Sequence, residues 1–171
     1  PELIRRSDVG GEAASVAVAA RVARLALMAH RDVLIMSSGG LVTSDAWRRA
    51  AQRSRGHLHV PSGALCGLDG VKAMAMGTIR RIQLTTRKPP RALAAAPFVH
   101  TRHLVLERLK RPRVLFDGSP ADAVKAFPQN TNVAATLALA SQRSRASTRV
   151  RVIADPSVRM NTHELEIEGD C

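Results

Sequence analysis

The sequence predicts an α/β protein in which part of a doubly wound parallel sheet is followed by an α+β region with a mixed sheet. Three observations lead to this prediction. Helical and strand-like segments alternate in the first part of the chain. Residues 32–37 form a nearly unbroken apolar run, typical of a parallel strand covered on both faces. From about Gly77, apolar and polar residues alternate, as in strands with one solvated face. We therefore expect two domains, residues 1–76 and residues 77–171.

The first domain is expected to alternate between helices and strands. Its expected elements are a helix at residues 13–30, a strand at 32–37, a tight turn at 37–40, a helix at 44–55 and a strand at 58–60. The first helix is rich in Ala, Val, Leu and Arg, a composition that fits a helix packed on a sheet. Thr43 or Ser44 can cap the second helix, and Gly56 can end it.

The segment Val60–Gly70 follows the last of these strands and is rich in small residues. Loops that leave the carboxyl ends of parallel strands are where such sheets bind ligands. Ser62 can cap a helix that runs to about Met76, while Gly63 and Ala64 would let a ligand approach the backbone. A compact turn without a ligand explains the same residues equally well. The sequence contains no Gly-x-Gly-x-x-Gly, so the usual pyrophosphate cradle of a dinucleotide site is not found in it.

The second domain is expected to combine half-solvated strands with helices. Its expected elements are an antiparallel strand at residues 79–87, a solvated basic connector at 88–113, a strand at 114–116, helices at 120–127 and 133–140, a polar loop at 142–148, and strands at 150–154 and 163–169. Ser119 followed by Pro120 is a typical helix start. Asn130 or Asn132 can cap the next helix.

The last strand contains the residue of greatest functional interest. Within Asn161–Gly169, the five residues 164–168 alternate strictly between acidic and apolar, which predicts a strand with one dry face and one wet face. Counting by two from Ile167 and Leu165 puts His163 on the dry face, where an imidazole can serve as a general acid or base beside a pocket. The alternative is a core histidine that bonds to the backbone.

Charge and composition narrow the classes of function. The net charge is +12, with 26 Lys and Arg against 14 Asp and Glu, but the arginines are spread in ones and twos and aromatic residues are few. We therefore expect no nucleic-acid partner. Without an apolar run of about 18 residues or an export leader, we expect no membrane association and a cytoplasmic location. Cys66 and Cys171 have no metal-type spacing, and neither have His100 and His103, so no metal site is expected.

Six blocks of the sequence, in order, resemble the L-aspartate dehydrogenase family. The blocks are Val60–Ala64, Leu84–Pro90, Leu115–Gly118, Phe127–Ala135, Ile153–Pro156 and Asn161–Gly169. The resemblance covers about Ser7 to Asp170. It implies that residues 1–76 are part of a Rossmann-like dinucleotide-binding domain and that residues 77–171 are part of an α+β substrate and catalytic domain. It also implies an oxidoreductase that exchanges hydride between NAD or NADP and L-aspartate, giving iminoaspartate and then oxaloacetate and ammonia, with a link to NAD biosynthesis.

Carried over residue by residue, the resemblance implies that His163 is catalytic and that Ala64 and Asn132 contact the nicotinamide end of the cofactor. A dicarboxylate substrate also needs cations. Arg87, Lys88 and Arg159 are candidates, although surface charge is the more ordinary explanation for each. The family's Gly-rich turn and its closing strand and helix have no counterpart in these residues. We therefore expect an internal part of a homodimeric enzyme that is inactive alone. The alternative is a non-catalytic remnant that acts in self-association or binding.

Overall fold

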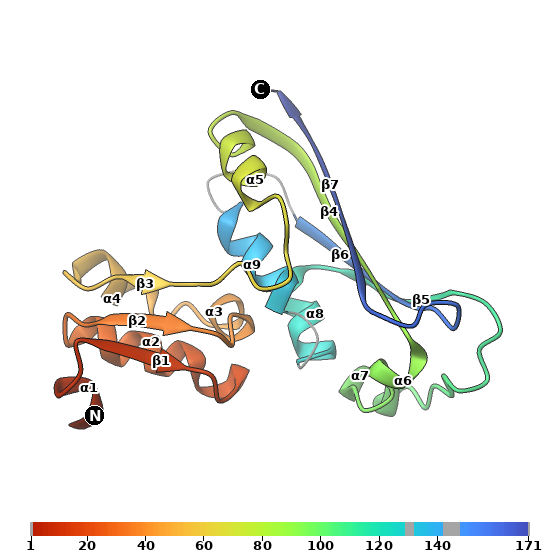
Figure 1. Ribbon diagram of the computed structural model, residues 1–171, viewed down its shortest axis with the longest axis horizontal. Helices are drawn as coiled ribbons and strands as arrows, with labels where there is room; N and C mark the ends of the chain where they lie inside the picture. Colours follow the sequence, from red (N-terminus) through yellow and green to blue (C-terminus); the bar gives the residue numbers. More distant parts are fainter. Residues whose placement is uncertain (1, 129–131, 142–147, 171) are drawn as a thin grey trace. The chain divides into compact units, whose positions relative to one another are not determined.

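The computed structural model describes residues 2–128, 132–141 and 148–170, and it divides into two compact units, residues 1–63 and 64–171 (Figure 1). Each unit has its own sheet. The division precedes the predicted boundary at 76/77 because helix α5 (Leu68–Met74) buries Val71 in the core of the second unit. No helix in the described part of the chain combines the length and the apolar character needed to cross a bilayer.

The first unit is built on a parallel sheet, as predicted. Its elements are α1 (Glu2–Arg5), β1 (Val9–Glu12), α2 (Val16–Met28), β2 (Asp32–Ile35), α3 (Gly39–Thr43), α4 (Arg48–Arg53) and β3 (Leu58–His59). The strands lie side by side in the order β1-β2-β3 (Figure 1). α1 and β1 are not predicted from the sequence. Two glycines in the four residues of β1 leave no alternation to detect.

Close packing of α2 against α3 shapes this unit. A Cβ on Gly40 would lie 2.3 Å from the carbonyl oxygen of Val16 and 2.8 Å from Cβ of Ala19, so this position accepts only glycine without movement of the backbone. The predicted tight turn at 37–40 overlaps the start of α3, which begins at Gly39. Ala23 and Leu27 of α2 are buried with Val33 of β2, and burial of such apolar side chains is the main favourable contribution to folding.

Glu12 ends β1 as a buried carboxylate whose hydrogen bonds are made by backbone amides. Its Oε1 accepts from the amides of Ala14 (2.8 Å) and Ser15 (3.0 Å), just before α2, and its Oε2 accepts from the amide of Ser37 (3.2 Å), after β2. Such bonds offset the cost of removing a polar group from water. The carboxylate thus joins the ends of two strands to the start of a helix.

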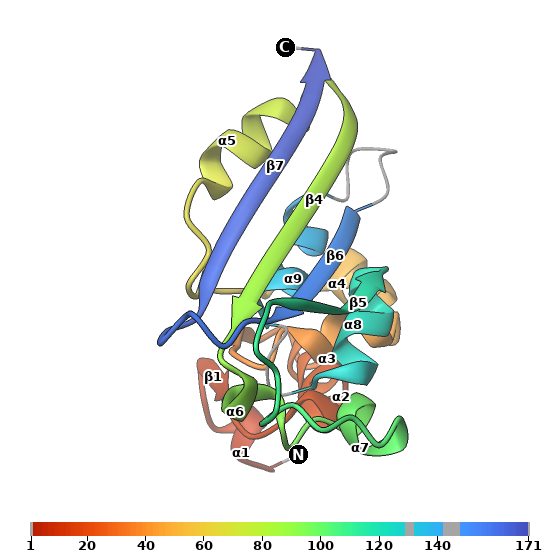
Figure 2. The ribbon, with the colours of Figure 1, turned by 90° about the vertical axis from the view of Figure 1, so that its right-hand side faces the viewer.

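The second unit is built on a mixed sheet, again as predicted. Its elements are α5 (Leu68–Met74), β4 (Thr78–Lys88), α6 (Pro90–Leu93), α7 (Pro97–Thr101), β5 (Arg113–Gly118), α8 (Pro120–Ala126), α9 (Asn132–Ala140), β6 (Thr148–Ala154) and β7 (Thr162–Asp170). The strand order is β5-β6-β4-β7. β4 pairs with β7 in antiparallel fashion, as expected, and with β6 in parallel. Figure 2 shows β4 and β7 side by side.

Two expectations for β4 and the connector after it are wrong. The face of β4 opposite Leu84 was expected to be solvated, but Gln83 and Thr85 are buried there. Polar side chains on this face form hydrogen bonds with one another within β4: Arg81 donates to Oε1 of Gln83 at 2.8 Å. The connector at 88–113 is not simply a solvated loop. It contains α6 and α7, and it supplies Leu93, Val99 and Leu106 to the core.

One of the predicted helix caps is present in the structure, and another is not. Ser119 caps α8, as predicted: its Oγ accepts from the amide of Asp122 at 3.2 Å. Ser62 does not cap α5, because that helix begins at Leu68 after Gly67, whose φ of 75° is left-handed. Asn132 is the first residue of α9, whereas Asn130 and the loop at 142–147 lie outside the described residues.

Candidate active site

β7 has the two faces that its sequence predicts. The side chains that alternate toward the core are half-buried, namely those of His163, Leu165 and Ile167. The glutamates between them, Glu164, Glu166 and Glu168, are exposed. Leu165 and Ile167 pack against the main core cluster of the second unit. His163 therefore lies on the dry face of the strand, near its start, as predicted.

The partner of His163 is a threonine on the neighbouring strand. The antiparallel register of β4 and β7 places Thr86 opposite His163, and Thr86 Oγ1 lies 3.0 Å from His163 Nδ1. Thr86 is buried, with 4% of its surface exposed. When Nδ1 carries the proton of a neutral imidazole, it donates to Oγ1, and Nε2 is left with a lone pair. This bond fixes the ring and leaves a nitrogen that can accept a proton.

Lys88 lies on the same face of β4 as Thr86, two residues further along the strand, because side chains two apart in a strand share a face. It is 4% exposed, so surface charge is the wrong explanation for this lysine. Of the other two cations considered for a dicarboxylate, Arg87 points to the opposite face and pairs with Asp155 at 3.6 Å, and Arg159 is exposed. The structure thus brings together Thr86, Lys88 and His163.

Burial and charge both act on His163. Burial lowers the pKa of its imidazole, and the positive charge of Lys88 lowers it further. Burial also lowers the pKa of the Lys88 ammonium. Removal from water disfavours the charged form of each group, and two like charges disfavour each other. His163 is therefore held as a neutral imidazole near neutral pH, the form that a general base requires.

The two expected cofactor contacts lie on other elements of the second unit. Ala64 is exposed in the turn after β3, and Asn132 is exposed at the start of α9. Gly63, next to Ala64, has a φ of 60°, and a Cβ built there would meet nothing within 4 Å. This turn therefore presents open backbone of the kind that a flat ring can approach.

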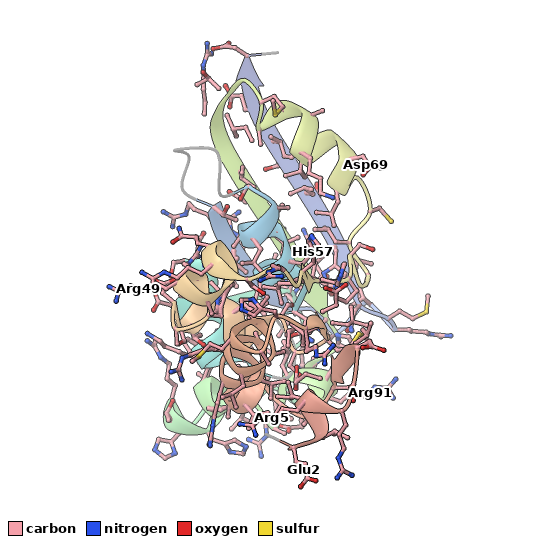
Figure 3. The ribbon with its side chains drawn as sticks, turned by 90° about the vertical axis from the view of Figure 1, so that its left-hand side faces the viewer. Glu2, Arg5, Arg49, His57, Asp69 and Arg91 are labelled. Atoms are coloured by element: carbon pink, nitrogen blue, oxygen red, sulfur yellow. The ribbon has the colours of Figure 1, made fainter. Side chains whose placement is uncertain are left out.

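The basic charge of the chain is distributed over separate elements. Figure 3 shows Arg5, Arg49 and Arg91, which belong to α1, α4 and α6. In the first unit, a hollow of about 670 Å³ lies between α2 and α4, and its lining includes Arg24, Arg49 and Arg53. The hollow involves none of the residues that the family resemblance singles out. Among the described residues, no group of three or more His, Cys, Asp or Glu is arranged to hold a metal ion.

Known proteins that are similar to this chain identify its family. The family model for the C-terminal part of aspartate dehydrogenase matches residues 69–171, the range that contains Thr86, Lys88, Asn132 and His163. The chain belongs to the aspartate dehydrogenase family. It is 41% identical over 172 residues to the L-aspartate dehydrogenase of Methanosarcina barkeri, a match that covers 99% of this chain and 63% of that protein.

Other members of the aspartate dehydrogenase family are also similar to this chain over nearly its full length. L-aspartate dehydrogenase 3 of Bordetella bronchiseptica is 38% identical over 170 residues, covering 99% of this chain and 62% of that protein. The crystal structure of aspartate dehydrogenase from Thermotoga maritima is similar with a TM-score of 0.77 and 25% identity, over 96% of this chain and 65% of that one. The predicted fold class is thereby confirmed. The chain spans slightly less than two thirds of the length of these relatives.

Proposed function

We propose that the complete protein is an L-aspartate dehydrogenase that uses His163 as its general acid/base. The observation that supports this most directly is the Thr86–His163 pair on the dry face of the sheet, within the part of the chain that matches the family model. The substrate is L-aspartate, and the product is iminoaspartate, which water converts to oxaloacetate and ammonia. A bound nicotinamide would accept the hydride that leaves Cα of the substrate.

The neutral imidazole of His163 can perform the proton transfers of this reaction. Its Nε2 lone pair accepts a proton from the substrate's nitrogen, or from the water that adds to the imine carbon. In the reverse direction, Nε2 returns the proton. Thr86 keeps Nδ1 occupied and the ring oriented throughout. A base of lowered pKa is mostly unprotonated at neutral pH, so it is ready to accept a proton.

We propose that Ala64 and Asn132 contact the nicotinamide end of NAD or NADP. The exposed turn at Ala64, with open space beside Gly63, fits a ring that lies against backbone. The exposed amide of Asn132 could hydrogen-bond a carboxamide. Because the sequence holds no Gly-x-Gly-x-x-Gly, we infer that residues 1–171 alone bind the cofactor weakly. Equilibrium dialysis with NAD and with NADP measures this affinity.

Broader proposals concern the location, the pathway and the partners of the complete protein. We infer a cytoplasmic enzyme that supplies iminoaspartate to NAD biosynthesis, and the exposed free thiol of Cys66 is compatible with a reducing compartment. We also infer that the complete protein is a homodimer with neither a nucleic-acid nor a membrane partner. Sedimentation equilibrium tests the dimer, and DNA binding at low salt tests the absence of a nucleic-acid partner, because phosphate contacts are strongest there.

The decisive experiment measures NAD(P)H formation from L-aspartate by the complete gene product, with D-aspartate and L-asparagine as comparison substrates. His163→Ala is expected to lower turnover by on the order of 100-fold or more, the size of a lost acid/base group. His100→Ala, which removes an exposed histidine at the end of α7, is the matched control and should keep full turnover. Unchanged turnover in His163→Ala would remove this residue from the mechanism.

A further inference from the structure

We propose that the hollow between α2 and α4 binds a free nucleotide, with arginine side chains holding its phosphates and apolar side chains holding its base. The volume of the hollow, about 670 Å³, lies within the range of roughly 300–1,000 Å³ that is usual for small-molecule sites. All of its lining residues belong to the first unit, whereas Thr86 and His163 belong to the second. The hollow is therefore a site additional to the one proposed for aspartate.

Two helices supply the positive charge of the hollow. Arg24 lies on α2, whereas Arg49 and Arg53 lie four residues apart on α4 and so project from the same side of that helix. All three line the hollow, and none of them forms an ion pair with a residue in the described part of the chain. The acidic residue in the lining, Asp45, pairs with Arg48. Three guanidinium groups thus face the hollow without a compensating anion.

Repulsion within α4 gives these arginines a structural cost. Like charges four residues apart destabilise a helix, and α4 has no acidic residue in its first turn to offset them. A guanidinium group presents paired N–H donors that match the oxygens of a phosphate. A phosphate bound between α2 and α4 therefore neutralises charges that the protein alone leaves opposed.

His30 adds a hydrogen-bond donor to the lining. Its Nδ1 accepts from the backbone amide of Arg55 at 3.3 Å, so the proton of the neutral imidazole lies on Nε2. Nε2–H can then donate to a phosphate oxygen. The hollow thus combines three cations with one neutral donor, a set of groups suited to a ligand with several anionic oxygens.

The remaining lining is apolar. Leu27 is buried, Ala46 and Ala50 contribute small side chains, and Met28 is 58% exposed. A flat base can pack against such side chains, and the thioether of methionine adapts to the shape of a ligand. Inorganic phosphate would fill only a small part of this volume and leave the apolar lining in contact with water. A nucleotide uses both kinds of surface.

One end of the hollow lies at the amino ends of the parallel strands. His30 follows α2 and comes two residues before β2 begins at Asp32. Arg53 ends α4, shortly before β3 begins at Leu58. Parallel sheets bind their dinucleotides outside the carboxyl ends of the strands. A nucleotide in the hollow is therefore separate from the nicotinamide cofactor and takes no part in hydride transfer.

Isothermal titration calorimetry of the complete gene product provides the first test. ATP is titrated without Mg²⁺ while NAD or NADP saturates the cofactor site, and one ATP is expected to bind per chain. Adenosine lacks the phosphates and inorganic triphosphate lacks the base, so each should bind at least roughly 10-fold more weakly. Absence of ATP binding, or displacement of ATP by either dinucleotide, would overturn the proposal.

Arginine variants locate the bound nucleotide. Arg49→Gln and Arg53→Gln each remove one charge from the hollow and should weaken ATP binding by roughly 10-fold, as for a lost charged hydrogen bond. Arg21→Gln is the matched control, because Arg21 is also exposed on α2 but does not line the hollow, and its affinity should equal that of the wild type. Circular dichroism verifies that each variant is folded. Equal losses in all three would mean that ATP responds only to net charge, and would refute the site.

A DNA duplex tests whether the ligand is a nucleic acid instead. Its phosphates are accessible, but its stacked bases cannot reach the apolar lining. At low salt, where phosphate contacts are strongest, the duplex is not expected to displace ATP. Displacement that is lost in Arg49→Gln and Arg53→Gln would identify the hollow as a nucleic-acid contact and overturn the nucleotide proposal. None of these outcomes depends on whether the protein oxidises aspartate.

Discussion

Thr86 Oγ1 and His163 Nδ1 lie 3.0 Å apart across adjacent antiparallel strands, although 77 positions separate the two residues in the sequence. Because this bond orients the imidazole, Thr86→Val should lower kcat of the complete enzyme by roughly 10-fold, the effect of a net hydrogen bond of about 1 kcal/mol or slightly more. KM for aspartate should change little. The measurement is the initial rate of NAD(P)H formation over a range of aspartate concentrations.

The adjacent residue provides the control for this variant. Thr85 is also buried on β4, but it faces the other side of the sheet, where its hydroxyl accepts from Nε2 of Gln83 at 3.4 Å. Thr85→Val makes the same chemical change without touching the imidazole, so kcat should stay at the wild-type value. Equal losses in the two valine variants would show that the sheet, and not the bond to His163, determines the rate.

The lowered pKa of His163 predicts a pH dependence of stability. Between the pKa of an exposed histidine, about 6.5, and the lower pKa in the folded protein, the unfolded chain binds a proton that the folded protein does not. The free energy of unfolding should therefore reach its full value above about pH 6.5, and it should decrease as the pH falls through this window. His163→Gln lacks this contribution.

Urea denaturation of the wild type and of His163→Gln at a series of pH values measures this effect, because the other histidines contribute equally to both proteins. The wild type should lose more stability than the variant as the solution becomes acidic. A difference in unfolding free energy that stays constant with pH would contradict a lowered pKa for His163.

The three phenylalanines of the chain form one cluster in the core of the second unit. Phe127 is fully buried, and its ring centroid lies 5.3 Å from that of Phe98 and 6.1 Å from that of Phe116. Phe127→Ala should lower the free energy of unfolding by about 3–5 kcal/mol, because it leaves a cavity in a packed core. Chemical denaturation measures the loss. Phe127→Leu fills most of that cavity and should cost clearly less.

The start of α8 tests a smaller effect. Ser119 Oγ accepts from the amide of Asp122 at 3.2 Å and also donates to its carboxylate at 2.7 Å. Ser119→Ala removes the cap and should lower the free energy of unfolding by about 1 kcal/mol. Ser119→Asn keeps an accepting side chain and should retain most of the stability. If the two variants were equally destabilised, the cap would not be the cause.

Local patterns account for what the sequence could predict. Strict alternation in β7 identified the inward side of His163, and Ser119 with Pro120 identified the start of α8. The same alternation could have identified Lys88, since it shares its parity with Ile82, Leu84 and Thr86 on β4. The two prolines after Lys88 indicate the end of the strand, and strand ends are usually solvated. For this reason, its burial was missed.

Pairings between distant segments account for what the sequence could not predict. The parallel pairing of β4 with β6 joins Ile82 to Thr148 and depends on everything folded between them, which no local period encodes. Core residues of the connector, such as Leu93 and Leu106, are apolar residues scattered among arginines, and they become interpretable only once the sheet that they cover is in place. The two units divide at 63/64 for the same reason: α5 buries Val71 in the core of the second unit, and no local pattern shows this contact.

The position of β4 between β6 and β7 has a consequence for biosynthesis. β4 leaves the ribosome well before either strand that flanks it, so its two edges must wait for partners encoded far downstream. Contacts of such long sequence separation form late and slowly. His163 lies on β7, which follows the other strands of the described sheet in the sequence, so Thr86 gains this neighbour only after β7 has been synthesised. A nascent chain that stalls before β7 would expose a long unpaired strand edge, the kind of edge that chaperones must shield from aggregation.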